Sequence, residues 1–122
     1  MTSTVIAANH EAPESRLFSE DRRMRAVVCH QWAEVDVLRV EEIAPPALTP
    51  DGVLIEVHAA GVNFADTLIV KGKYQTRPAF PFSPGMEVAG IVTQVGEQVR
   101  SLQPGQRVLA FLDYGGFAEE VV

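Results

Sequence analysis

Short apolar runs, separated by turn-forming residues, constrain the fold of this chain more than any other feature. Clusters such as Thr49-Pro50-Asp51-Gly52 and Gln103-Pro104-Gly105-Gln106 interrupt the sequence at intervals. Glycine and proline favour turns because glycine tolerates positive φ and proline fixes φ near a single value. No apolar run approaches the roughly 20 residues that a membrane-spanning helix needs. The chain is therefore expected to fold into short elements joined by turns.

Most of these runs are predicted to be β-strands. Segments 37–43 and 53–60 alternate apolar and polar residues, which is typical of half-buried strands. The predicted strands cover 25–30, 37–43, 53–60, 87–95, 107–112 and 117–122. Gly90 lies inside one of them, where a glycine often marks a bulge or a close backbone approach. Six short strands with regular turns predict a mainly β domain, a small barrel or a sandwich.

One segment has helical character. Asn63 is a candidate N-cap and Gly72 a stop signal, so a short helix is expected near 63–72. Phe64, Leu68 and Lys71 fall on one side of it. The proline-rich segment 73–85 that follows is expected to be a loop long enough for a functional role.

The first 24 residues are polar and have no steady period, so they are predicted to be a flexible extension, with a short helix near 15–22 as one option. They lack the basic start and apolar core of a leader sequence, and they are acidic at Glu11, Glu14, Glu20 and Asp21. The folded domain is expected to cover 25–122, in a cytoplasmic protein.

Composition narrows the function classes. With 47% hydrophobic and 21% charged residues the chain is typical of a globular protein. Its net charge of −6 disfavours nucleic-acid and membrane-surface partners, which usually call for basic residues. The single cysteine, Cys29, cannot form an internal disulfide and is expected to be a small core residue.

The sequence contains neither a zinc-binding motif nor the common dinucleotide-binding motif. The histidines His10, His30 and His58 are scattered, and no ligands occur at zinc spacing. His58 is expected at the surface. No GxGxxG follows a strand and opens a helix, so the usual means of holding a dinucleotide phosphate is absent.

Polar residues gather where a strand meets the predicted helix. Asn63, Asp66, Thr67 and Tyr74 could form hydrogen-bonding groups of a cleft, with Tyr74 donating to a developing oxyanion. The alternative roles are structural: a helix cap for Asn63, a first-turn charge for Asp66 and a loop anchor for Tyr74. The pattern by itself favours the structural roles.

Three longer motifs carry a family resemblance. They are AAGVNFADTLIVKGKY (59–74), PFSPGMEVAGIVTQVGEQV (81–99) and QPGQRVLAFLDYGGFAEEVV (103–122). In order and spacing they resemble the medium-chain dehydrogenase/reductase superfamily, and within it the quinone oxidoreductases of the zeta-crystallin type. The resemblance covers about 24–122. It implies a truncated GroES-like catalytic domain, a small β-barrel without the Rossmann domain that follows in the family.

The resemblance also implies zinc-free chemistry. Zinc alcohol dehydrogenases carry a cysteine ligand at the position of Asn63 and a His-Glu pair at Met86-Glu87. Their four-cysteine lobe is missing here, because Gly96 runs directly on to Gln103. An amide and a thioether are poor substitutes for thiolate and imidazole as zinc ligands. The implied reaction is hydride transfer from NADPH, bound mainly by the missing domain, to a quinone or another conjugated carbonyl.

Site residues follow from the same resemblance. It implies catalytic roles for Asn63 and Tyr74 in a cleft shaped by Asp66, Thr67 and Leu68. Many quinone oxidoreductases have a tyrosine at the position of Leu68, whereas related enoyl-thioester reductases place a catalytic tyrosine at the position of Tyr74. The alternatives are therefore a 2-enoyl-thioester reductase and a stand-alone, non-catalytic GroES-like binding module. A full-length homodimer is implied, and this chain by itself is expected to expose apolar surface.

Overall fold

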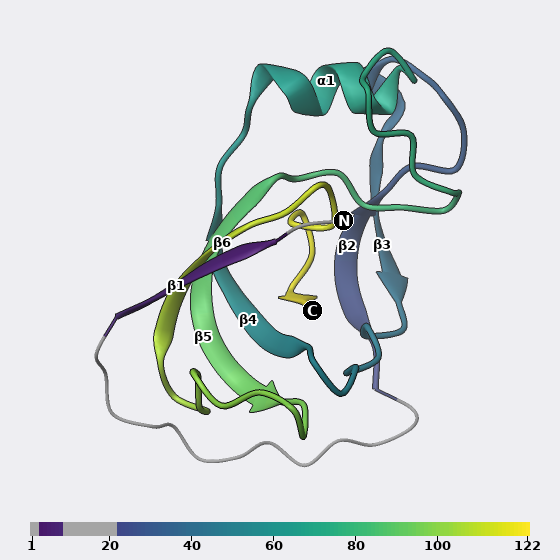
Figure 1. Cartoon of the computed structure of the whole chain (residues 1–122). Helices are drawn as coiled ribbons and strands as arrows, with labels where there is room; N and C mark the ends of the chain where they lie inside the picture. The colour runs from purple at the N-terminus through teal and green to yellow at the C-terminus, as the bar shows by residue number, and fades with distance from the viewer. Residues whose placement is uncertain (1–2, 9–21) are drawn as a thin grey trace.

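Two antiparallel sheets and one short helix make up the computed structural model, which describes residues 3–8 and 22–122 (Figure 1). The larger sheet has the strand order β1-β6-β5-β4-β7, and the smaller one pairs β2 with β3. The strands are β1 (Thr4–Ala8), β2 (Met24–Val28), β3 (Arg39–Ile43), β4 (Val53–Ala60), β5 (Glu87–Val95), β6 (Arg107–Phe111) and β7 (Glu120–Val121). Helix α1 spans Phe64–Val70, and a 3₁₀ turn spans Val35–Val37. The predicted mainly β fold with one short helix is confirmed.

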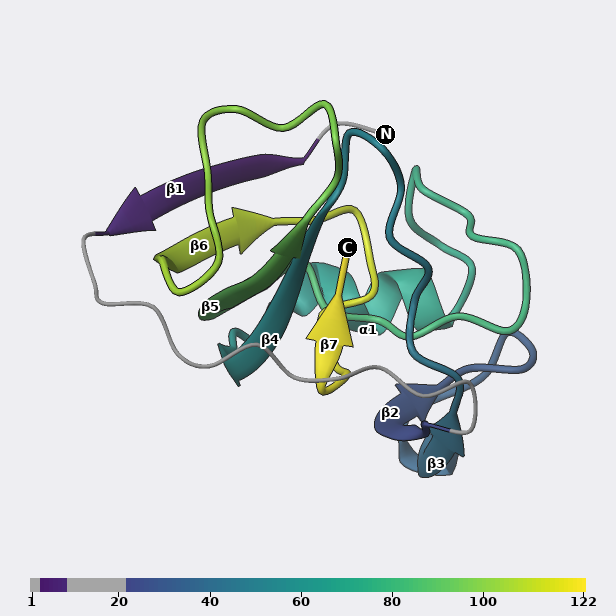
Figure 2. The same cartoon turned by 90° about the horizontal axis from the view of Figure 1, so that it is seen from below.

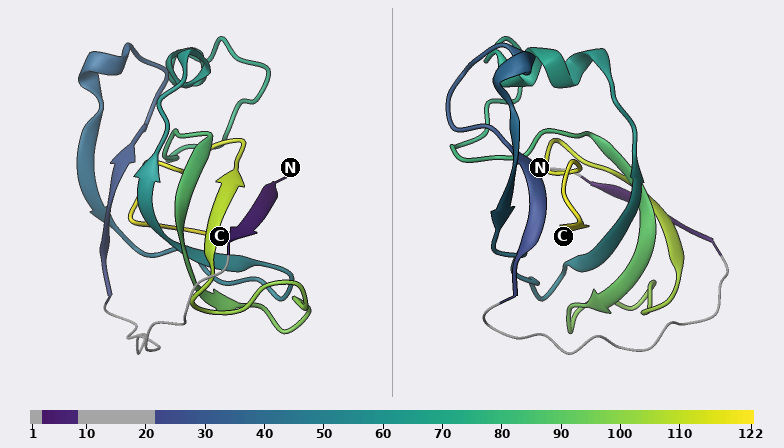
Figure 3. Two further views of the ribbon diagram at one scale, coloured as in Figure 1. Left: turned by 90° about the vertical axis from the view of Figure 1, so that its left-hand side faces the viewer. Right: turned by 180° about the vertical axis from the view of Figure 1, so that it is seen from behind.

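The large sheet is curved, its central strands β4, β5 and β6 pair in chain order, and α1 lies across one end of it (Figures 1 and 3). Its longest pairing joins β4 and β5, with register shifts between Leu54 and Ile55 and between Val57 and Ala59. Such bulges bend and twist a strand, which lets the sheet curl around its own core.

Gly90 sits at the tightest approach in this pairing. It is opposite Val57, and an ideal Cβ at position 90 would lie 2.1 Å from the carbonyl oxygen of Glu56. Real Cβ atoms do not come so close to a backbone oxygen, so only glycine allows β4 and β5 to pair here. The predicted close backbone approach at Gly90 is confirmed.

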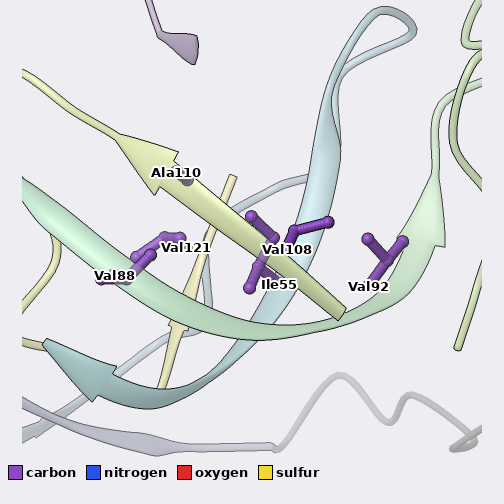
Figure 4. Packing of buried hydrophobic residues seen from close by; sticks show 6 residues of the cluster. All are labelled: Ile55, Val88, Val92, Val108, Ala110 and Val121. Atoms are coloured by element: carbon purple, nitrogen blue, oxygen red, sulfur yellow. The ribbon is translucent and has the colours of Figure 1, made fainter. Parts of the chain in front are cut away.

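The main core forms between β4, β5, β6 and β7, whose apolar side chains converge in Figure 4. Burial alternates along β6, where Val108 and Ala110 point inward and their neighbours are exposed. This period of two is that of a strand with one buried face. The buried cluster consists of Ile55, Val88, Val92, Val108, Ala110 and Val121.

Backbone hydrogen bonds join β2 and the residue after it to the loops that lead into β7 and β5. The amide of Val27 donates to Phe117 (2.8 Å), and the amide of Cys29 donates to Phe82 (2.8 Å). Seen from below, β2 and β3 lie beyond β7 (Figure 2). These links bring the start of the folded domain next to its last strand.

Element boundaries differ from the predictions at several ends. The strand predicted at 37–43 begins at Arg39, because Val35–Val37 form a 3₁₀ turn. The strand predicted at 117–122 shrinks to Glu120–Val121, because residues 115–119 make loop contacts to other segments. The helix buries Asp66, Ile69 and Val70, whereas Phe64 is 78% exposed. The side containing Phe64 and Leu68 is therefore not its buried face.

The N-terminal prediction was wrong for β1. This strand pairs with the edge strand β6, from Thr4 opposite Phe111 to Ala8 opposite Arg107. Only Val5 packs on the main core, and Ile6 remains 52% exposed. A single inward-facing residue shows no alternation in the sequence. The pairing of β1 with β6 also depends on backbone hydrogen bonds, which do not depend on a side-chain pattern. The helix considered at 15–22 falls almost wholly outside the described residues, and the domain boundary near 24 stays a prediction.

Large apolar side chains are exposed outside the core, as expected. The most exposed are Val62 (80%), Phe64 (78%) and Val40 (65%). A surface of this kind favours association, which stays a prediction. In the described part of the chain, no helix is long and apolar enough to cross a membrane.

Candidate active site

The predicted polar cluster begins where β4 leads into α1. Asn63 takes an extended backbone conformation, with φ −117° and ψ 153°, and acts as the N-cap of the helix. The backbone N–H of Asn63 donates to Oδ2 of Asp66 at 2.7 Å. An acidic residue in the first turn suits the positive end of the helix. The local sequence therefore places Asn63, half-buried, at the start of α1.

Asp66 holds a second backbone group from a distant part of the chain. Its Oδ1 accepts a hydrogen bond from the amide of Gly85 at 3.2 Å, and the residue is only 4% exposed. Both carboxylate oxygens are thus engaged by backbone N–H groups. The structural role that the sequence offered for Asp66 extends beyond its own helix.

The segment containing Gly85 is fixed from its other side as well. The amides of Gly116 and Phe117 donate to the carbonyls of Gly85 (3.0 Å) and Pro84 (2.9 Å). Gly85 has a φ of +108°, and a Cβ there would lie 2.6 Å from the amide nitrogen of Phe117. This position needs glycine for both its conformation and its contacts.

A further contact brings Glu87 beside the same loop. The amide of Gly61 donates to the carbonyl of Glu87 at 3.1 Å, and a Cβ at position 61 would lie 1.9 Å from Glu87 Oε1. Segment 61–63 and segment 85–87 therefore lie side by side. From the sequence, Glu87 was named only in a comparison with zinc enzymes, and Gly61 was not predicted as part of the site. The available signal was the glycine two residues before the helix cap.

Thr67 and Leu68 lie on α1 and are half-buried. The hydroxyl of Thr67 donates to the carbonyl of Phe64 within the helix at 2.7 Å. Thr67 is thus engaged by its own helix, and its predicted role in shaping the cleft stays a prediction, as does that of Leu68.

Tyr74 follows the helix and packs on a second buried cluster formed by Cys29, Ile69, Val70 and Phe82. Met86 packs against the same cluster, so Tyr74 and the 85–87 segment contact the same group of buried side chains. No other described residue forms a hydrogen bond with the Tyr74 hydroxyl. The packing suits a loop anchor, and the hydroxyl keeps its donor capacity for a ligand.

An aromatic group anchors the loop that carries Tyr74. Trp32 meets Phe80 edge to face, with ring centroids 4.5 Å apart, and the guanidinium of Arg77 lies 5.0 Å from the Trp32 ring centroid. Gly72, with φ +70°, approaches the Trp32 ring closely. These contacts hold both ends of the loop against the rest of the domain.

The predictions for histidine and cysteine are confirmed where they can be compared. His58 is exposed, and its Nε2 lies 3.4 Å from Oε1 of Glu56. Cys29 is 1% exposed, and its thiol donates to the carbonyl of Gln31 at 3.0 Å. His10 lies outside the described residues. Across residues 3–8 and 22–122, no three or more His, Cys, Asp and Glu residues are grouped so as to hold a metal ion.

Burial raises the pKa of the Cys29 thiol above its ordinary value, so we expect slow modification of the native protein. At pH 8 a thiol-specific reagent should react at least about tenfold more slowly with native than with urea-unfolded chain, because the thiolate is the reacting form. The raised pKa also means that this thiol favours folding below its unfolded pKa and loses that contribution as pH rises above it. Equal rates in the two states would contradict the buried placement.

The fold and this arrangement define a class of protein. The family profile of the alcohol dehydrogenase GroES-like domain matches residues 49–122, more than half of the chain, and the chain belongs to this family. Within it, the sequence fits the quinone oxidoreductases of the medium-chain dehydrogenase/reductase superfamily. Every strand pair among the described residues is antiparallel, and no Rossmann domain is present in them.

Particular relatives support this placement. Rat quinone oxidoreductase-like protein 2 is 37% identical over 103 residues, which cover 84% of this chain and 29% of that protein. Rat quinone oxidoreductase is 41% identical over 98 residues, which cover 79% of this chain and 30% of that protein. The structure of Escherichia coli quinone oxidoreductase complexed with NADPH superimposes with a TM-score of 0.69 at 29% identity, covering 80% and 30%. The chain thus spans less than a third of the length of these relatives.

Proposed function

We propose that this chain forms part of an NADPH-dependent reductase that transfers hydride to a quinone or another conjugated carbonyl without zinc. The observation that carries the proposal is the pairing of segment 61–63 with segment 85–87. This pairing puts the cap residue Asn63 next to the segment that bears Met86. The family placement supports an oxidoreductase, and the NADPH-bound relative supports the cofactor.

The side chains present fit the reacting end of such a cofactor better than its phosphates. Asn63 offers a side-chain amide that can donate and accept, and Tyr74 offers a hydroxyl with no hydrogen-bond partner among the described residues. When bound, NADPH supplies the hydride. This chain then positions the acceptor and donates a hydrogen bond, or a proton, to its carbonyl oxygen.

Zinc-free chemistry is proposed from the donors at the two key positions. Asn63 and Met86 present an amide and a thioether, which do not form an ordinary zinc site with a lone carboxylate such as Glu87. An acceptor that is already conjugated to a carbonyl needs no Lewis acid of that strength. A small-molecule acceptor, a cytoplasmic location and a homodimer belong to the same proposal.

The test uses the full-length protein that contains this chain. We expect NADPH oxidation with quinones, unaffected by a zinc chelator, and a loss of about tenfold to a hundredfold in kcat for Tyr74→Phe with enone or enoyl-thioester acceptors. Tyr114→Phe is the matched control, because Tyr114 packs on the same buried cluster and is the only other tyrosine. A full-length protein that oxidises NADPH with none of these acceptors would refute the proposal.

Tyr74 also favours a second candidate, a 2-enoyl-thioester reductase. If quinone turnover survives Tyr74→Phe while enoyl reduction is lost, the tyrosine serves the enoyl reaction specifically. Equal losses with both acceptors would contradict that assignment.

A further inference from the structure

We propose that Asp66 is a positioning residue whose carboxylate sets the separation between Asn63 and the 85–87 segment. Its consequence for catalysis rests on the proposed function, whereas the structural link does not. The two hydrogen bonds of Asp66, to the amides of Asn63 and Gly85, carry the inference.

The environment of Asp66 differs from that of an ordinary surface carboxylate. It is 4% exposed, and no basic side chain in the described part of the chain forms an ion pair with it. A buried carboxylate is costly unless its oxygens accept hydrogen bonds. Backbone N–H groups meet that need, and hydrogen bonds to a charged acceptor are stronger than neutral ones. The two amides are therefore held tightly to one small group.

These two amides belong to segments with different supports. Asn63 continues from β4 into α1, while Gly85 is fixed by the amide of Gly116 through its own carbonyl. The Asp66 side chain links the β4–α1 junction to the 85–87 segment. The backbone hydrogen bond between Gly61 and Glu87 links the same two segments beside it. Without the carboxylate, the Gly61–Glu87 bond would be the one hydrogen bond left, among the described residues, between the start of α1 and the 85–87 segment.

Asp66 itself is too buried to meet a substrate, so its effect on chemistry passes through Asn63 and the 85–87 segment. Small displacements at a reacting centre are costly, because catalytic groups act only at the right separation. Asp66 should therefore influence kcat more than the KM for NADPH.

The test is Asp66→Asn in the full-length protein, read first by hydrogen–deuterium exchange without cofactor. Asparagine keeps the shape but turns an NH₂ group toward one of the two amides, so one bond is lost. We expect exchange to rise about tenfold in peptides spanning 83–87 or, where the NH₂ group faces the backbone amide of Asn63 instead, in peptides spanning 61–65, because one charge-assisted bond is lost. Thr67→Val is the control: its hydroxyl bonds only within α1, so exchange at 83–87 should stay at the wild-type rate.

Exchange in β5 and β6 peptides shows whether the variant has kept its fold. Should Asp66→Asn unfold, Asp66→Glu replaces it, and exchange at 83–87 should rise while those strands stay protected. Wild-type exchange at both 61–65 and 83–87 in a folded variant would overturn the proposal. So would raised exchange with unchanged kcat in an active enzyme. If the wild-type protein reduces no quinone or enoyl acceptor, the proposed function fails, and the exchange result still decides the structural link.

Discussion

Gly90→Val is expected to remove most of the stability of the fold. The new side chain would begin with a Cβ 2.1 Å from the carbonyl oxygen of Glu56 and 2.8 Å from a methyl group of Ile55. A flexible side chain can move aside, but the carbonyl belongs to β4 and is held in the sheet. The clash can therefore be relieved only if β4 and β5 move apart where they pair. We expect a loss of about 3 kcal/mol or more, which is a large part of the stability of a typical domain.

Ala89→Val is the matched control for this prediction. Ala89 precedes Gly90 on β5, and its side chain points to the other, partly exposed side of the sheet. Valine has good strand propensity, so the change should alter the free energy of unfolding by about 0.5 kcal/mol or less. Urea unfolding of both variants, followed by the fluorescence of Trp32, the only tryptophan, measures the difference. A Gly90→Val protein as stable as the control would contradict the close approach.

Ile69→Ala should destabilise the end of the domain that carries the candidate site. Ile69 is fully buried and packs with Cys29, Val70 and Phe82 beneath α1. Truncation removes three methyl or methylene groups and leaves a cavity that a packed cluster fills only in part. Such changes cost about 2–5 kcal/mol, and we expect about 3 kcal/mol here. In a domain of this size that corresponds to a fall in Tm of roughly 10–15 °C.

The control for Ile69 is Val62→Ala, which truncates an apolar residue just before the same helix. Val62 is 80% exposed, so its loss should change Tm by no more than about 2 °C. Thermal unfolding monitored by circular dichroism compares the two variants. If both lower Tm equally, the buried cluster under α1 does not contribute as the packing indicates.

Much of the fold was readable because it depends on local patterns. Alternation of apolar and polar residues predicted the strands at 37–43 and 53–60, and turn residues located the breaks between strands. The cap at Asn63 and the stop at Gly72 located α1 within a residue or two. Strand β1 was missed because its place on the edge of β6 depends on backbone pairing with a segment about a hundred residues away.

The candidate site was predictable in its membership but not in its arrangement. Asn63, Asp66 and Tyr74 were selected from the sequence because polar residues gather at the strand-to-helix junction. The sequence could not show that Asp66 faces Gly85 instead of an open cleft. Nor could it show that Glu87 lies against Gly61, since neither contact follows from spacing along the chain.

The sequence alone thus determined the strands other than β1, the helix and the family resemblance, because each rests on residues close together in the chain. The tertiary structure alone decided which backbone groups satisfy the Asp66 carboxylate and which positions must be glycine. Those features depend on how closely segments approach after packing. The approach of β4 to Gly90 depends on the pairing of β4 with β5, and the approach of Phe117 to Gly85 depends on the contact between the loops that precede β7 and β5.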